Sequence, residues 1–115
     1  MRDFRIKPSH IVCLVLPLLL SSSFALFADD IDAKRSAELR NLLYQDCGSC
    51  HGMRLTGGLG PALTLDIMKT RPREYLFATI RDGRPETPMP AWQNLLNDAD
   101  INWLVTYLQT QKAAE

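Results

Sequence analysis

The sequence predicts an all-α domain. Apolar residues recur at helical intervals in segments 31–46, 72–81 and 97–108, and no segment alternates apolar and polar residues as a half-buried strand does. The chain has no internal repeat. Its 115 residues, 46% of them hydrophobic, suffice for one small globular domain and a separate N-terminal segment. The formal net charge of zero argues against a nucleic-acid-binding surface.

The N-terminal segment has the order of parts of a secretory signal peptide. Basic residues open the chain, an uncharged apolar run follows at residues 11–20, and serines and small residues come after it. We expect cleavage after Ala28, with cleavage after Ala25 as the alternative. The chain is then divided into a signal peptide, residues 1–28, and an exported mature domain, residues 29–115.

An uncleaved membrane anchor is the competing interpretation of this segment. Pro17 and three consecutive serines make it a poor membrane span, for which about 20 continuous apolar residues are expected. Removal of the signal peptide also removes Cys13 and His10. The mature chain then holds two of the three cysteines, Cys47 and Cys50, and a single histidine.

The first predicted helix covers residues 31–46. Leu39, Leu42 and Leu43 fall near one of its faces, while charged residues lie mostly on the others. The helix leads into the cysteine-containing segment, and Gly52 is expected to end it.

Residues 47–51 read Cys-Gly-Ser-Cys-His. Two thiols separated by two residues can reach the two vinyl groups on one edge of a porphyrin, and the next residue is then held beneath the iron. The motif predicts one covalent haem c, attached through Cys47 and Cys50, with His51 as an axial iron ligand. Because haem c is attached outside the bacterial inner membrane, the motif and the signal peptide both indicate the periplasm.

Two other interpretations of the motif are weaker. A thioredoxin-like redox pair is expected within a βαβ unit, which the sequence lacks, and has no need of the following histidine. A structural zinc site needs four ligands, and no second Cys/His pair is present to complete one.

The middle of the chain is predicted to form a loop at residues 56–61, a helix at residues 72–81 and a second loop at residues 84–92. Residues 56–61 are rich in glycine, which lets a backbone pass close to a flat ligand. Residues 72–81 form a helix with Pro72 in its first turn and Gly83 as its stop. Its apolar spacing comes from three residues: Tyr75, Leu76 and Ile80.

The last predicted helix begins at Asn97, a good N-cap, and has acidic residues in its first turn, where the helix dipole favours them. Trp103 and Tyr107 are one turn apart and are expected to stack. The apolar face has i, i+3, i+4, i+7 spacing and consists of Ile101, Leu104, Val105 and Leu108. We expect this face to pack on the first helix.

The second axial ligand has three candidates in the mature chain. Met53 is too close in sequence to the histidine to reach the opposite side of the ring. Met68 lies in an apolar run that indicates core packing. Met89 lies between Pro88 and Pro90, which stiffen the loop and suit a thioether held at a fixed position. We predict Met89 as the ligand, the alternative being that it only fills a gap in the packing.

With the 47–51 motif, Gly60-Pro61 and the Thr-Pro-Met-Pro loop at 87–90 in this order, the mature chain resembles the class I c-type cytochromes. The resemblance implies a fold in which the N- and C-terminal helices cross and helices and loops wrap around one haem. It also implies that the carbonyl of Pro61 accepts a hydrogen bond from His51.

Residues 47–63 and 87–92 resemble more specifically the cytochrome c55X family, encoded beside cytochrome cd1 nitrite reductase in denitrifying bacteria. This resemblance implies a periplasmic one-electron carrier of denitrification that donates to cytochrome cd1 nitrite reductase. The alternative is a redox partner in haem d1 maturation. A haem enzyme or sensor is a third hypothesis, but it would require a displaceable sixth ligand, whereas occupied axial positions favour electron transfer over catalysis.

Overall fold

The computed structural model describes residues 31–111, and within this range it is helical and has no strand. The all-α prediction is confirmed. The elements in chain order are α1 (Ala33–Leu42), η1 (Leu43–Cys47), α2 (Gly48–His51), α3 (Leu65–Met68), α4 (Arg73–Asp82) and α5 (Asp98–Thr110). The predicted signal peptide lies outside the described residues. None of the helices within 31–111 is long and apolar enough to span a bilayer.

The first predicted helix is confirmed, and Gly52 ends it as expected, with a φ of 86°. The helical path is longer than the residues assigned to the helix, 31–46: it continues past Asp46 through η1 and α2 to His51. η1 is a wider, π-helical turn, in which the N–H of Gly48 donates to the carbonyl of Leu43, five residues earlier. The Cys-Gly-Ser-Cys-His motif is therefore itself helical.

The last predicted helix is confirmed as α5. The side chain of Asn97 accepts a 2.9 Å hydrogen bond from the N–H of Asp100, and the Asp100 carboxylate accepts one of 3.2 Å from the N–H of Asn97. This reciprocal capping box satisfies two backbone donors that a helix start leaves unpaired. Trp103 and Tyr107 stack as expected, with ring centroids 5.2 Å apart and planes inclined by 9°.

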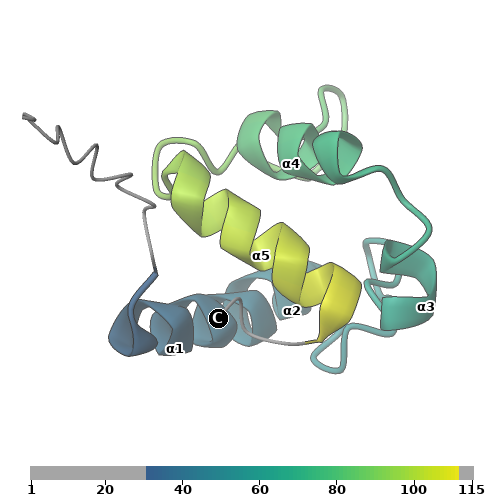
Figure 1. Ribbon diagram of the computed structural model, residues 1–115. Coiled ribbons are helices and arrows are strands. Elements are labelled where there is room, and N and C mark those ends of the chain that lie inside the picture. The colour runs from purple at the N-terminus through teal and green to yellow at the C-terminus, as the bar shows by residue number, and fades with distance from the viewer. Residues whose placement is uncertain (1–30, 112–115) are drawn as a thin grey trace, which may run out of the picture.

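The terminal helices cross as expected: α5 runs across α1, as Figure 1 shows. The apolar faces of the two helices meet in the centre of the core. The largest fully buried side chains come from this crossing and its continuation into η1: Leu39, Leu43, Ile101, Leu104 and Val105. The helix that carries the cysteine motif is thereby fixed against the C-terminal helix.

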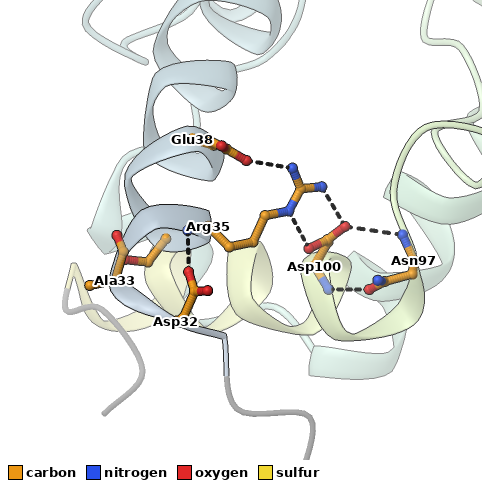
Figure 2. Close-up of polar contacts among 7 residues, drawn as sticks. Asp32, Ala33, Arg35, Glu38, Asn97 and Asp100 are labelled. Carbon is orange, nitrogen blue, oxygen red and sulfur yellow. Dashed lines mark hydrogen bonds and ion pairs between the residues drawn. The ribbon is translucent and has the colours of Figure 1, made fainter.

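A partly buried ion pair joins the two helices at one side of the crossing, as Figure 2 shows. Arg35 of α1 donates from Nε to Oδ1 of Asp100 at 2.9 Å and from Nη2 to Oδ2 at 2.7 Å. The Asp100 side chain is only 3% exposed, and Arg35 also pairs with Glu38. The Asp100 carboxylate thus joins α1 to α5 while it caps α5.

α3 and α4 complete the fold. α4 confirms the middle helix, although Pro72 caps it and does not lie in its first turn; Gly83 follows it as expected. The sequence did not predict α3, because four residues are too few to show a helical period. Both helices contact α5. Arg73 donates to Oγ1 of Thr106 at 2.9 Å, and Gln109 donates to the carbonyl of Arg71 at 2.8 Å.

The Arg35–Asp100 pair should make the fold sensitive to acid. Hydrogen bonds from Arg35 are the main reason that the pKa of Asp100 lies below its ordinary value of 3.8. A lowered folded-state pKa contributes stability that is present at neutral pH and is lost as the pH falls through that value. We expect Asp100→Asn to lose about 1–3 kcal/mol of unfolding free energy at neutral pH. Denaturant unfolding of the variant at several pH values measures this.

Asp98→Asn is the matched control, since Asp98 is an exposed carboxylate in the same first turn of α5. It should lose less stability than Asp100→Asn and should keep the acid dependence of the native protein. Equal losses in the two variants would contradict the role given to the pair.

Candidate functional site

The five predicted site residues line one cavity of about 400 Å³: Cys47, Cys50, His51, Pro61 and Met89. They come from η1, α2, the loop after α2 and the loop after α4, elements far apart in the chain (Figure 1). Most of the remaining lining is apolar and includes core residues of η1 and α5: Leu43, Leu104 and Leu108.

The other two methionines differ in their burial and in their contact with the cavity. Met53 is 57% exposed and is not among the residues that line the cavity. Met68 is 5% exposed and belongs to the hydrophobic core, although one side of it reaches the cavity. Met89 is half-buried and lies at the wall contributed by the loop after α4.

Cys47 and Cys50 are half-buried, and no disulfide joins them. Burial raises the pKa of the Cys47 thiol to about 11, and the neighbouring charge of Asp46 adds to this. A thioredoxin-like pair needs the opposite shift, because its attacking cysteine reacts as a thiolate. The environment of Cys47 thus gives a second reason to reject the thioredoxin interpretation.

The imidazole of His51 is buried and oriented by one hydrogen bond. Its Nδ1 lies 2.7 Å from the carbonyl oxygen of Pro61. A carbonyl can only accept, so Nδ1 carries the proton and donates it. Nε2 is left with its lone pair, which is the form of histidine that binds a metal.

The glycine-rich loop folds back on the end of α2. The N–H of Gly57 donates to the carbonyl of His51 at 2.8 Å, and the N–H of Gly60 donates to the carbonyl of Cys50 at 2.8 Å. These bonds satisfy carbonyls that the end of a helix leaves unpaired. We expected the loop to pass close to a flat ligand. Within the protein, Gly60 of this loop lies close to the imidazole of His51: a Cβ on Gly60 would lie 2.7 Å from Cε1 and 2.8 Å from Nδ1.

Met89 is fixed by its backbone. Its carbonyl accepts a 3.1 Å hydrogen bond from the N–H of Arg84, and its N–H donates to Oγ1 of Thr87 at 3.3 Å. The loop packs on Gly83, whose φ is +69° and where a Cβ would lie 2.7 Å from the carbonyl oxygen of Met89. Only glycine fits this position without strain.

Tyr75 differs from its prediction. We expected it on the apolar face of its helix, but it is 46% exposed and lines the cavity, with its hydroxyl 3.3 Å from Nη1 of Arg84. The apolar period of α4 could not separate a residue that packs in the core from one that faces a ligand cavity.

The residues present fit haem c. The haem ring is largely apolar, and so is the cavity lining. Two cysteines, one histidine and two methionines, Met68 and Met89, line the same cavity, and these are the residue types that attach haem c and bind its iron. No group of three or more His, Cys, Asp or Glu side chains within residues 31–111 could hold a metal ion by itself.

The contact between Gly60 and His51 can be tested by adding a methyl group. Gly60→Ala would place a Cβ 2.7 Å from Cε1 of His51, so the ring or the loop must move and the bond to Pro61 must weaken. We expect a loss of about 1–3 kcal/mol in unfolding free energy, typical of overpacking, and a changed visible spectrum of the haem-loaded protein. Gly48→Ala is the control, because its Cβ meets nothing closer than 3.4 Å. Equal behaviour of the two variants would contradict the steric role of Gly60.

Known proteins match most of the chain. Residues 34–108 match the family described as cytochrome c oxidase, cbb3-type, subunit III. The cytochrome c55X of Pseudomonas aeruginosa is 54% identical over 107 residues, which are 92% of this chain and 90% of that protein. A solved structure of the c-type cytochrome NirC has a TM-score of 0.68 at 58% identity, and the match covers 73% of this chain and 99% of that chain.

A larger protein matches in part. The dihydro-heme d1 dehydrogenase of Pseudomonas aeruginosa is 36% identical over 67 residues, which are 58% of this chain and 14% of that protein. A solved structure of such a dehydrogenase has a TM-score of 0.56 at 33% identity, covering 65% of this chain and 16% of that chain. The resemblance inferred from the sequence is confirmed: the chain belongs to the cytochrome c55X family of c-type cytochromes, whose cofactor is covalently bound haem c.

Proposed function

We propose that the protein is a periplasmic, monohaem, one-electron carrier that donates to cytochrome cd1 nitrite reductase. The observation that carries this proposal is that His51 and Met89 reach the same cavity as the two cysteines. A haem attached there has a ligand available for each axial position.

Each of these residues has a distinct task in the proposal. Cys47 and Cys50 would hold the ring through thioether bonds. The carbonyl of Pro61 keeps His51 in the tautomer whose Nε2 can bind iron. Met89 would supply a neutral thioether as an iron ligand, which would favour the ferrous state relative to a second imidazole. When bound, haem c supplies an iron that accepts and releases one electron.

Electron transfer is favoured over catalysis because a filled sixth position leaves no place for a substrate on the iron. The third hypothesis, a haem enzyme or sensor, needs Met89 to leave. Both backbone groups of Met89 are hydrogen-bonded to its own loop, which supports a fixed ligand. Prompt binding of carbon monoxide to the ferrous protein at neutral pH would favour the enzyme or sensor.

The second candidate function is electron transfer in haem d1 maturation. It is favoured by the partial match to a dihydro-heme d1 dehydrogenase. Dehydrogenation removes two electrons and two protons from its substrate. A carrier with one haem would therefore accept electrons in two successive encounters. The chemistry at this chain's own site is the same in both candidate functions, and only the partner differs.

The periplasmic location is supported by two features of the sequence. Residues 1–28 have the composition of a secretory signal peptide, and haem c is attached beyond the bacterial inner membrane. N-terminal sequencing of the protein purified from periplasm would test the cleavage after Ala28.

The donor role predicts a specific reoxidation experiment. The purified ferrous protein is mixed with cytochrome cd1 nitrite reductase, and its absorbance is followed with and without nitrite. We expect fast reoxidation that continues only while nitrite is present, because nitrite returns the reductase to its oxidised form.

Two controls interpret the result. Ferrous protein mixed with nitrite alone should remain reduced, because nitrite is not expected to displace His51 or Met89 from the iron. Ferric protein mixed with a dihydro-heme d1 dehydrogenase and its substrate tests the second function, for which two proteins should be reduced per substrate consumed. Slow oxidation by the reductase together with this stoichiometry would replace the donor role by the maturation role.

A further inference from the structure

Two cationic side chains line the otherwise apolar cavity. Among the described residues that form its wall, Arg71 and Arg84 are the arginines, there is no lysine, and Asp46 is the acid. Arg71 precedes α4 in the chain, and Arg84 follows it. Two residues of α4 that line the cavity, Tyr75 and Thr79, carry hydroxyl groups.

The backbones of both arginines are fixed. The carbonyl of Arg71 accepts the 2.8 Å bond from Gln109 of α5, and its N–H donates to the carbonyl of Met68 at 3.1 Å. The N–H of Arg84 donates to the carbonyl of Met89, and its own carbonyl accepts from Oγ1 of Thr87 at 2.8 Å. Arg84 therefore closes the loop that carries Met89.

Neither arginine forms an ion pair with a carboxylate of the described residues. The ion pairs within residues 31–111 involve Arg35, Lys69 and Arg81 as cations, and neither Arg71 nor Arg84. The guanidinium of Arg84 is held from one side by the hydroxyl of Tyr75 at 3.3 Å. Its remaining donors are available to an anion.

Haem supplies such anions. It carries two propionate carboxylates on the ring edge opposite the two vinyl groups. Thioether bonds to Cys47 and Cys50 would hold the vinyl edge at η1 and α2, and the carboxylates would then lie toward the other walls of the cavity. Arg71 and Arg84 are exposed, so water also reaches this part of the wall. Charge-assisted hydrogen bonds stabilise a carboxylate there, and guanidinium groups supply them in pairs.

We propose that Arg71 and Arg84 bind the propionate carboxylates of the haem, with Tyr75 positioning the Arg84 guanidinium. Arg84 then links the haem to the loop that carries Met89, because its guanidinium binds a propionate and its backbone N–H donates to the carbonyl of Met89. This inference depends on the haem site and not on which protein receives the electron.

The test measures the midpoint potential of the isolated, haem-loaded protein, without any partner. Arg71→Gln and Arg84→Gln each leave a propionate charge uncompensated, which stabilises the ferric state. We expect each variant to have a lower potential than the native protein. Arg81→Gln is the matched control: it removes one arginine charge three residues from Arg84, but Arg81 is paired with Asp82 and does not line the cavity.

A second measurement observes the carboxylates directly. With isotope-labelled propionates, the infrared carboxylate bands should shift in Arg71→Gln and Arg84→Gln and stay unchanged in Arg81→Gln. If Arg84→Gln fails to incorporate haem, Arg84→Lys replaces it in the infrared measurement only, because it keeps the charge but loses the planar pair of donors; its carboxylate bands should still shift. Potentials and bands in the cavity variants that match those of Arg81→Gln would overturn the proposal. Failure of the nitrite reductase experiment would leave it intact.

Discussion

The site depends on the hydrogen bond from Nδ1 of His51 to the carbonyl of Pro61. It selects the tautomer and fixes the plane of the imidazole, so that Nε2 is the atom left for iron. The bond exists because the glycine-rich loop turns back over the end of α2 and satisfies its last carbonyls. Gly60 lies so close to the imidazole of His51 that a side chain at position 60 would displace the imidazole. A helix end, a loop and a metal ligand are thus one unit.

The crossing of α1 and α5 supports this unit. The bidentate pair of Arg35 and Asp100 joins the two helices, and the same carboxylate caps α5. Apolar residues of η1, which continues α1, and of α5 belong both to the core and to the cavity wall, among them Leu43 and Leu104. A shift of one terminal helix would therefore change the haem cavity as well as the core. In a domain this small, a covalently held apolar ring also adds buried surface that the chain alone does not supply.

Local signals in the sequence predicted much of this structure. The helical periods placed α4 and α5, Asn97 was recognisable as a cap, and the Cys-Gly-Ser-Cys-His motif located the cavity. What the sequence could not provide was pairing at long range. Nothing local indicates that Asp100, which suits the dipole of its own helix, is held by Arg35, or that Tyr75 faces the cavity and holds Arg84. The π-helical turn of η1 was also missed, because a single wider turn leaves the apolar period almost unchanged.

The central claim is that His51 and Met89 both bind the iron. X-ray absorption at the iron edge of the ferrous, haem-loaded protein measures this directly. We predict one sulfur beside the four pyrrole nitrogens and one imidazole nitrogen. The sulfur should be lost in Met89→Leu and kept in Met68→Leu, which changes a methionine in the wall of the same cavity. An iron without sulfur in the native protein, or a sulfur that disappears with Met68, would contradict the account.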